Sequence, residues 1–428
     1  MSKVIRMTDM VNPHFYKLWT TKKSYIIAKG GRGSFKSSVI SLKLVTSVKK
    51  WTQLHKKVNV VCILANKSDL HDTVYSQIMW ALDMLNLSDE YNYYKSPLRI
   101  THKLTGSTFY FYGADNPHKL KSNKVDNIIA VWFEEAANMK GVDVFDQSIP
   151  SFIRQKPDYV DDVKVYFSYN PPRNPYEWIN DWVTAREEDP EYFVDTSTYL
   201  DDELGFTTEQ QLKLIESYKN NDYDYYRWLY LGEVIGLGTN IYNMDNFKAL
   251  KELPSDDYIT NWFCAIDSGH EVSATTFGAY GLTRKDNVIL LDTYYYSPQG
   301  KAHKKPPSEL SKDLYSFINK SATKLTIDSA EGALDNQFYN DYGVHLHKVA
   351  KLKKVDMIDR VQNIVAQGRF YYLDTEANKI FIEEHRNYRW DEKTLNSDDP
   401  KVIKEEDHTC DQFQYFVRDN ERLLGLRY

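Results

Sequence analysis

Short apolar runs alternate with helical periods along the first 170 residues of the chain. Four of these runs are nearly continuous in apolar side chains, which is typical of strands that are covered on both faces. They lie at residues 25–28, 59–65, 127–135 and 163–168. A helical period follows the first run and another follows the second. The pattern therefore predicts an α/β domain built on a buried sheet. The same reasoning predicts a hairpin from strands at 99–104 and 107–112, and a helix at 207–231.

The second half of the chain has a different pattern of apolar and polar residues. Three consecutive runs rich in β-branched and aromatic residues, joined by short turns, predict an antiparallel meander. They lie at residues 261–266, 274–280 and 287–296. Further patterns predict helices at 308–319, 355–367 and 408–419, and strands at 324–327 and 344–348. Stretches rich in glycine and proline bracket the predicted domain boundary, which gives domains at residues 1–238 and 258–428 joined by residues 239–257.

The first apolar run ends in a glycine-rich loop, and a helix follows. The loop reads Gly30-Gly31-Arg32-Gly33-Ser34-Phe35-Lys36-Ser37. Three glycines allow backbone N–H groups to approach phosphate oxygens, and the helix N-terminus adds partial positive charge. On this interpretation Lys36 reaches the outer phosphates and Ser37 holds Mg²⁺. Phe35 departs from the nucleotide-loop pattern, because glycine normally precedes the lysine. The alternative is a glycine-rich turn with a solvated lysine.

Polar residues end the third and fourth apolar runs. Glu134 and Glu135 stand at the carboxyl end of a buried strand, where ligands of open α/β sheets bind. Glu134 would assist Mg²⁺ through its water shell, and Glu135 would orient and deprotonate an attacking water. Aspartate is usual at the first position, so Glu134 is a departure. Ser168 and Asn170, at the tip of the next strand, either sense the terminal phosphate or belong to an ordinary strand that is stopped by proline.

Three aspartates from distant parts of the second half are predicted to converge. Asp267 ends the first strand of the meander, Asp328 ends the strand at 324–327, and Asp411 projects from the final helix. Such a cluster binds two divalent ions about 4 Å apart, one activating water and one stabilising the leaving oxygen in phosphodiester hydrolysis. Any one of these aspartates alone is more simply a turn former, so the prediction depends on their combination.

Other polar residues of the second half have two interpretations each. His408 either assists beside Asp411 or is merely exposed, and Asp292 is structural or accessory. Two groups of basic residues either track a DNA backbone near the acids or are simply solvated. They are Lys301, His303, Lys304 and Lys305, and Lys348, Lys351, Lys353 and Lys354.

The composition of the chain further limits its possible domain organisation and function. A chain of 428 residues exceeds what one hydrophobic core usually serves, so two domains are expected. The net charge of −6 argues against a protein that coats nucleic acid with its whole surface, but allows one that binds DNA in a local groove.

No membrane-length apolar run or signal-peptide core is found, so the protein is expected to stay where it is made. The three cysteines are widely separated and are expected to be buried thiols in a reducing compartment. Aromatic residues ahead of the first strand, such as Phe15 and Trp19, either stack on a nucleotide base or pack on the domain, and we favour packing.

The chain resembles the large terminase subunit of tailed double-stranded DNA bacteriophages over essentially its full length. The likeness depends on the order and spacing of several motifs, none of which is diagnostic alone. They are GGRGSFKSS at 30–38, VWFEE at 131–135, YFSYNPP at 166–172, YLGE at 230–233, and the sequences AIDSG, TIDSA and DHTCDQFQYF around the three aspartates.

The resemblance implies an α/β chain with an N-terminal P-loop ATPase domain of the ASCE type, including a linker subdomain, followed by a C-terminal RNase H-like nuclease domain. It implies cutting of concatemeric viral DNA and ATP-driven pumping of that double-stranded DNA into a procapsid through the portal protein. It also implies a working ring, usually a pentamer, and a small terminase subunit that selects the DNA. The expected cofactors are ATP with Mg²⁺, and two Mg²⁺ or Mn²⁺ ions at the nuclease site. The expected location is the cytoplasm of the infected bacterium, transiently at the portal vertex.

Matched by position, the family's motifs assign roles to residues of this chain. The nucleotide-binding residues are Gly30, Gly31, Arg32, Gly33, Ser34, Lys36, Ser37 and Ser38. The metal ligands are Ser37, Glu134, Asp267, Asp328 and Asp411, and the catalytic residues are Glu135, Asp267, Asp328 and Asp411. Ser168 and Asn170 belong to the motif that couples nucleotide state to movement.

Two other functions fit the same residues. One is a helicase or repair ATPase fused to a nuclease, which would separate the strands of a duplex. The other is a scaffold whose second domain keeps the RNase H-like shape without activity. Strand-separation and metal-dependent cleavage assays would distinguish these functions from a packaging motor.

Overall fold

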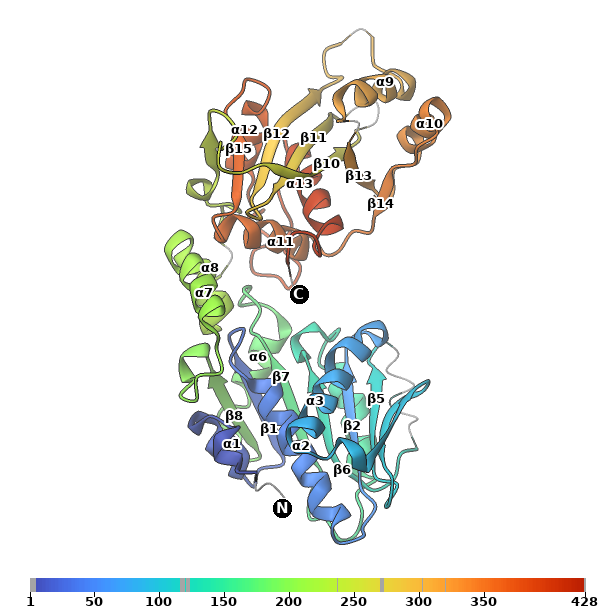
Figure 1. Ribbon diagram of the computed structural model, residues 1–428, viewed down its shortest axis with the longest axis vertical. Coiled ribbons are helices and arrows are strands. Elements are labelled where there is room, and N and C mark those ends of the chain that lie inside the picture. The colour runs from blue at the N-terminus through green and yellow to red at the C-terminus, as the bar shows by residue number, and fades with distance from the viewer. Residues whose placement is uncertain are drawn as a thin grey trace. The chain divides into compact units, whose positions relative to one another are not determined.

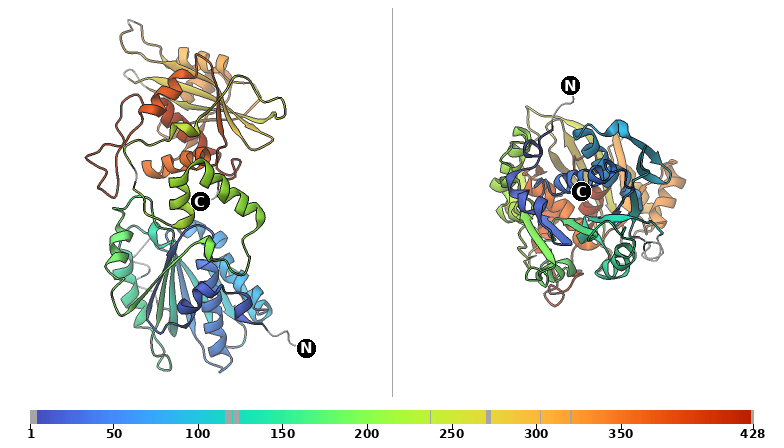
Figure 2. Two further views of the ribbon diagram at one scale, coloured as in Figure 1. Left: turned by 90° about the vertical axis from the view of Figure 1, so that its left-hand side faces the viewer. Right: turned by 90° about the horizontal axis from the view of Figure 1, so that it is seen from below.

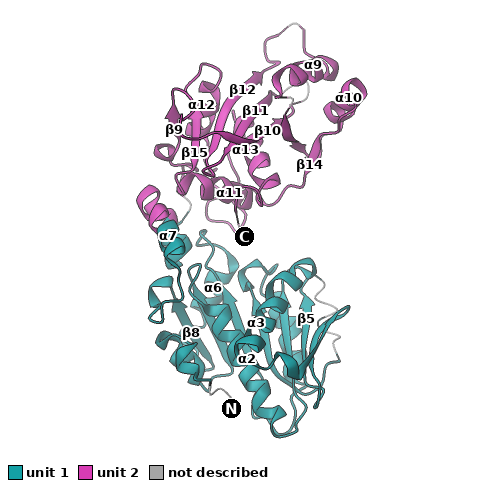
Figure 3. Cartoon of the chain, in the orientation of Figure 1, with its two compact units in different colours: residues 1–215, 226–236 teal, residues 216–225, 237–428 magenta. Residues whose placement is uncertain are grey.

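The chain forms two compact units, which Figure 3 colours separately. The computed structural model describes residues 5–115, 120, 124–236, 238–269, 273–301, 303–319 and 321–426. Unit 1 comprises Met1–Ile215 and Tyr226–Gly236, and unit 2 comprises Glu216–Tyr225 and Leu237–Tyr428. Each unit is therefore made from two separate pieces of the chain.

Unit 1 is built on an eight-stranded sheet in the order β3-β4-β5-β2-β6-β7-β1-β8 (Figure 1). The strands from β5 to β8 in this order run parallel, and β3 and β4 extend one edge in antiparallel pairs. The bounds are β1 Tyr25–Gly30, β2 Asn59–Leu64, β3 Tyr91–Lys95, β4 Leu98–His102, β5 Thr108–Gly113, β6 Ile128–Glu134, β7 Lys164–Tyr169 and β8 Tyr192–Ser197. All four predicted apolar runs are strands of this sheet, and the predicted hairpin is β4 with β5.

Helices cover both faces of this sheet (Figure 2, left). The bounds are α1 Tyr16–Thr20, α2 Lys36–Thr52, α3 Ser76–Met84, α5 Asp143–Ile153 and α6 Trp178–Thr184. Successive residues of β1 alternate between the two apolar layers, as the pleat of a strand requires. Ile26 and Ala28 pack in the layer that contains α2, whereas Ile27 packs in the layer that contains Phe145 of α5 and Trp182 of α6.

The predicted helix at 207–231 is two helices, α7 Glu209–Asn221 and α8 Tyr223–Leu231. Asp222 separates them, and its carboxylate accepts a hydrogen bond of 3.0 Å from the backbone N–H of Tyr225. Aspartate in this position satisfies a backbone donor at the start of a new helix. The helical spacing of apolar residues continues across this break, so the sequence predicted one helix where the cap at Asp222 separates two.

Unit 2 contains a seven-stranded sheet in the order β14-β13-β10-β11-β12-β15-β9. Antiparallel β10, β11 and β12 form the predicted meander, and the remaining pairs are parallel. The strands are β9 Lys248–Leu250, β10 Ile259–Asp267, β11 Thr275–Thr283, β12 Val288–Tyr296, β13 Ala322–Asp328, β14 His347–Val349 and β15 Phe370–Leu373. The helices are α9 Pro307–Phe317, α10 Ala333–Tyr342, α11 Lys354–Ala366, α12 Lys379–Asn387 and α13 His408–Asp419.

The last helix, α13, is held against the meander by aromatic packing. Phe416 stacks on Tyr280 of β11, with ring centroids 4.2 Å apart, and contacts Phe263 of β10. Phe413, one turn earlier, contacts Phe370 of β15. Aromatic pairs of this kind add to the free energy of burial, so they fix the position of the helix that carries Asp411.

The three cysteines are free and buried, as expected. Within the described parts of the chain, no helix has both the length and the apolar character needed to cross a membrane.

One close backbone contact in unit 1 leads to a stability prediction. A Cβ atom added at Gly31 would lie 1.8 Å from the carbonyl oxygen of Tyr230, at the end of α8. We therefore expect Gly31→Ala to destabilise unit 1 by more than about 2 kcal/mol, because backbone atoms have to move apart. Calorimetric unfolding measures this, with Gly141→Ala as the control, since a Cβ there meets open space. Equal unfolding temperatures for the two variants would contradict the prediction.

Candidate functional site

The candidate nucleotide site lies where three parallel strands of unit 1 end side by side. In the register of β1, β7 and β6, Ser168 pairs with Ala28 on one side and with Glu134 on the other. The glycine-rich loop leaves β1 at the same edge and leads into α2. Carboxyl ends of neighbouring parallel strands are a common position for ligand sites in α/β sheets.

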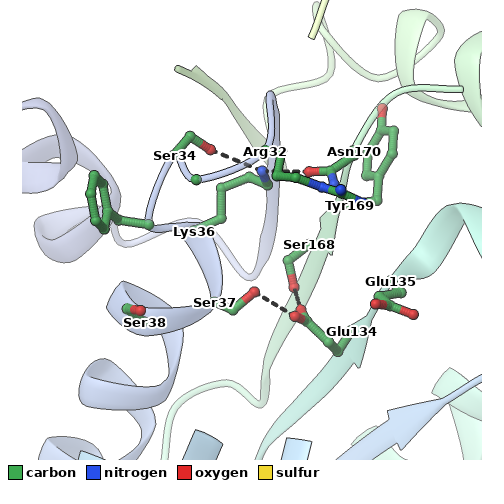
Figure 4. A pocket seen from close by; sticks show the side chains of 12 residues that line it. Arg32, Ser34, Lys36, Ser37, Ser38, Glu134, Glu135, Ser168, Tyr169 and Asn170 are labelled. Atoms are coloured by element: carbon green, nitrogen blue, oxygen red, sulfur yellow. Dashed lines mark hydrogen bonds between the residues drawn. The ribbon is translucent and has the colours of Figure 1, made fainter. Parts of the chain in front are cut away.

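A pocket of about 310 Å³ opens at this edge (Figure 4). Its volume is in the range of small-molecule sites. The lining residues are Arg32, Gly33, Ser34, Phe35, Lys36, Ser37, Ser38, Glu134, Glu135, Ser168, Tyr169 and Asn170. The structure thus brings most of the residues predicted for this site to one cavity. Gly30 and Gly31 are outside the lining, and their carbonyl oxygens instead accept hydrogen bonds from Lys36.

Phe35 adopts the left-handed backbone conformation for which glycine is normally needed. Its φ is 66°, and it forms the N-cap of α2. This conformation is unfavourable for a side chain with a Cβ. The ring packs against the apolar layer that contains α2 and makes an edge contact with Phe206, with centroids 5.9 Å apart. The departure from the consensus is therefore one of residue type, while the glycine-like backbone is kept.

The ammonium group of Lys36 is buried and surrounded by oxygen acceptors. It donates to the carbonyls of Gly30 and Gly31 at 3.0 and 2.9 Å, to Ser34 Oγ at 2.9 Å and to Asn170 Oδ1 at 2.8 Å. Burial lowers the pKa of Lys36 to about 8, although Glu134 and Asp195 oppose this by favouring the charged form. A positive charge that is surrounded mainly by neutral acceptors is suited to an incoming phosphate anion.

Glu134 is the centre of the polar contacts in the pocket. Ser37 and Ser168 each donate a hydrogen bond to its carboxylate (Figure 4). Trp132 Nε1 in turn donates to Ser168 Oγ at 2.6 Å. Burial raises the pKa of Glu134 to about 7, and the two serine hydrogen bonds oppose the rise. A carboxylate beside a serine hydroxyl is the kind of oxygen donor set that Mg²⁺ prefers, so the residues present fit a magnesium ion.

Glu135 extends the acidic wall of the pocket. Its backbone is also left-handed, with φ 50°, and Asn138 Nδ2 donates to its Oε2 at 3.1 Å. Burial raises the pKa of Glu135, and Asp69 raises it further, whereas Asn138 and Arg32 favour the ionised form. A carboxylate with a raised pKa is better able to accept a proton near neutral pH than an ordinary surface glutamate.

A second group of acids lies at one edge of unit 2. Asp267 and Asp328 end neighbouring parallel strands, β10 and β13, whose preceding residues Ile266 and Ile327 are paired. Burial raises the pKa of Asp267 to about 6, and the negative charge of Asp411 adds to the rise. Burial also raises the pKa of the Tyr415 phenol, with further contributions from Asp411, Asp267 and Asp328. The three predicted acids are therefore near enough to influence a common side chain.

Each of these acids has a partner in the unit itself. His408 Nδ1 lies 3.0 Å from Asp267 Oδ2, and this contact raises the pKa of the imidazole. Lys351 pairs with Asp328 and Lys354 pairs with Asp411. Among the residues that the structure describes, no group of three or more His, Cys, Asp or Glu side chains is spaced to hold a metal ion. The oxygen donors fit Mg²⁺ or Mn²⁺ in kind, but the lysines occupy two of them.

The structure also decides between several interpretations of single residues. His408 contacts Asp267, so it is more than an exposed histidine. Asp292 is exposed on β12 and bonds the N–H of Thr293, which favours a structural role. Phe15 is fully buried, as packing on the domain requires.

Two residues of the sites were missed in the sequence. Trp132 reaches Ser168 from within an apolar run, where nothing marks its polar N–H as functional. Tyr415 lies four residues after Asp411 and seven after His408, so the helical period places all three on one face of α13. That spacing could have identified Tyr415, because residues on one helix face share an environment.

Comparison with known proteins relates both parts of the chain to phage terminases. The family model for the phage terminase large subunit matches residues 22–233, and the model for the terminase RNAseH like domain matches residues 267–419. The chain is similar to the large terminase subunit of Bacillus phage SPP1, with 23% identity and 98% of each chain covered. It is also 32% identical over 132 residues to the PBSX phage terminase large subunit of Bacillus subtilis (strain 168), covering 30% of this chain and 28% of that one.

The fold is also that of a solved structure. The large terminase of a thermophilic bacteriophage aligns with a TM-score of 0.77 and 21% identity, covering 96% of this chain and 99% of that one. The predicted fold class, a P-loop ATPase domain followed by an RNase H-like domain, is confirmed.

The charges in the pocket of unit 1 predict how nucleotide binding depends on pH. In metal-free buffer, Glu134 gains a negative charge as the pH rises through about 7, and Lys36 loses its positive charge as the pH rises through about 8. Both changes disfavour the binding of a triphosphate, and the nearby carboxylates of Glu135 and Asp195 add further negative charge. We expect the affinity for a fluorescent ATP analogue in EDTA to fall about tenfold between pH 7 and pH 9.

A matched variant separates the two groups. Glu134→Gln removes the titration near pH 7 and keeps the size of the side chain, so the fall that remains belongs to Lys36, whose pKa drops below about 8 without the nearby carboxylate. A flat affinity profile of this variant up to pH 9 would contradict the assignment.

Proposed function

Because this chain belongs to the large terminase subunit family of phages, we propose that it hydrolyses ATP in unit 1 to move double-stranded DNA into a procapsid. We further propose that unit 2 cuts that DNA as a metal-dependent endonuclease. The observation that carries the proposal is the contact between Ser37 of the loop helix and Glu134 at the end of β6. It joins the glycine-rich loop to the acidic strand end in one pocket, as a nucleotide hydrolase needs.

In the ATPase site, each lining residue has a role that suits its chemistry. Lys36 and Arg32 would bind phosphate oxygens, together with N–H groups of the loop. Ser37 and Glu134 would hold Mg²⁺, which when bound neutralises charge on the phosphates. Glu135 would orient the attacking water and accept its proton. ATP as the nucleotide is further supported by the large terminase of the same thermophilic bacteriophage, which has been solved in complex with ADP and with ATP-gamma-S.

Asn170 is suited to sense the nucleotide. Its Oδ1 accepts a hydrogen bond from Lys36, and neighbouring Ser168 donates to Glu134. Both partners would change their contacts when phosphate and Mg²⁺ arrive, so strand β7 would report the state of the pocket. This supports a coupling role for Ser168 and Asn170.

In unit 2, Asp267, Asp328 and Asp411 would hold two Mg²⁺ or Mn²⁺ ions, which supply an activated water and stabilise the leaving oxygen in phosphodiester cleavage. Three carboxylates at the ends of two strands and on one helix support this assignment. His408 would fix the orientation of the Asp267 carboxylate through its 3.0 Å contact.

Membership of the family supports a set of partners. We propose that the chain works as a homo-oligomeric ring, a pentamer, with the portal protein and a small terminase subunit, in the cytoplasm of the infected bacterium and transiently at the portal vertex. A ring keeps hold of DNA between strokes, which a single ATPase would release.

The role of Glu135 is tested by Glu135→Ala. We expect kcat for ATP hydrolysis to fall by about 100-fold or more, because the base is lost, while ATP affinity changes little. Phosphate release and equilibrium nucleotide binding measure the two effects, with Asp143→Ala, an exposed acid on α5, as the control. Retained turnover would remove Glu135 from the role of base.

The nuclease is tested by Asp267→Ala. Plasmid cleavage in Mg²⁺ or Mn²⁺ should fall to background while ATP hydrolysis is kept, because the two sites use separate residues. Asp292→Ala removes an exposed acid from the middle of β12 and should leave both activities unchanged. Loss of both activities in a folded Asp267→Ala protein would show that the sites are not independent.

A further inference from the structure

A short segment of unit 2 brings two lysines to the candidate metal ligands. Lys351 Nζ lies 2.5 Å from Asp328 Oδ2. Lys354 Nζ donates to Asp411 Oδ1 and, at 3.2 Å, to Gln414 Oε1. These lysines are three residues apart, between the end of β14 and the first turn of α11. One segment therefore neutralises two acids that come from different elements.

The segment is anchored where it begins and again at Leu352. Before it, Val349 of β14 pairs with Asp328, and the carbonyl of Val349 accepts the N–H of Ser329 at 3.2 Å. Within it, Leu352 packs against the cluster of Val349, Met357 and Tyr415.

The two acids are shielded and Lys354 is partly buried, whereas the Lys351 side chain is 49% exposed. Lys351 Nζ lies 5.4 Å from the ring centroid of Tyr415. The Asp328 and Asp411 side chains are only 11% and 18% exposed. Ion pairs with shielded carboxylates are stronger than ion pairs on an open surface, which contribute little to the free energy of folding.

These ion pairs are incompatible with metal ions on the same oxygens. Mg²⁺ approaches a carboxylate oxygen to about 2.1 Å, and an ammonium bonded to that oxygen would then lie within a few ångströms of the metal. Like charges at such a distance, in a partly desolvated site, repel strongly. Metal entry therefore requires Lys351 and Lys354 to leave Asp328 and Asp411.

We infer that Lys351 and Lys354 compete with divalent metal ions for Asp328 and Asp411 and, once displaced, bind phosphates of the DNA backbone at the same edge. The inference depends on the proposed nuclease function and makes the two lysines positioning residues of that site. A lysine ammonium can exchange a carboxylate for a phosphate because it is a point charge without a fixed fork geometry. The exchange links metal and DNA, so each ligand tightens the binding of the other. The carboxylates then acquire their metal ions when DNA is present.

The test measures Mn²⁺ affinity of the full-length protein without DNA, by electron paramagnetic resonance of the free ion. Lys351→Met and Lys354→Met keep the apolar stem and remove the charge. Lys353→Met is the matched control, because Lys353 is exposed between them and the change in net charge is identical. We expect about threefold to tenfold tighter Mn²⁺ binding in each of the two variants than in the control.

A second arm tests the exchange to DNA. Mn²⁺ titrations are repeated with a saturating, cleavage-resistant phosphorothioate duplex. The duplex should tighten Mn²⁺ binding to the wild type and to Lys353→Met, and should tighten it less for the double variant Lys351→Met/Lys354→Met. Equal tightening in all three proteins would overturn the DNA part of the inference.

The outcomes separate this inference from the proposed function. Mn²⁺ affinities of Lys351→Met and Lys354→Met that equal or fall below that of Lys353→Met would overturn the competition, while the nuclease proposal would stand. Equal Mn²⁺ binding by wild type and Asp267→Ala would mean that no metal site exists at this edge, and both proposals would fail. Circular dichroism of each variant confirms that the comparison is made between folded proteins.

Discussion

The nucleotide pocket depends on one buried carboxylate that two serine hydroxyls hold. A buried charge is unfavourable unless hydrogen bonds compensate for its lost hydration. For Glu134, those bonds come from Ser37 on α2 and Ser168 on β7, and Trp132 supports Ser168 in turn. The acid can therefore be accommodated only where β6, β7 and the loop helix meet. The same contacts that make its burial tolerable also set the positions of the groups that face a nucleotide.

The candidate metal ligands of unit 2 are also partly buried carboxylates, but different groups compensate for their lost hydration. Its acids also lie at strand ends and on a helix, but ammonium groups and an imidazole contact them in place of hydroxyls. Aromatic stacking of α13 on the meander fixes where Asp411 lies. The two centres therefore differ in what an incoming cation meets. In unit 1 it meets hydroxyl groups that can turn toward it, whereas in unit 2 it meets cations that have to move away.

The sequence predicted the parts of the fold that burial determines. Strands such as β2 and β6 are covered on both faces, so their apolar runs are unmistakable. The two edge strands of the first sheet were missed, because four of the five residues of β3 are exposed and β8 is only partly covered. The acids proposed for both sites were selected because they end predicted buried strands or lie on the last predicted helix. The pairing of Lys351 and Lys354 with acids was not predicted, since it depends on which long-range partner a flexible side chain meets.

Phe35 illustrates how a motif can change its residue type and keep its shape. A left-handed backbone at a residue other than glycine costs about 1–3 kcal/mol unless the surroundings over-determine it. Here that support comes from the apolar layer that contains α2 and from Phe206, which lies far outside the loop in sequence. The two aromatic positions are therefore expected to be inherited as a pair. A lineage that reverts to glycine in the loop would lose the reason to retain an aromatic ring at its distant neighbour.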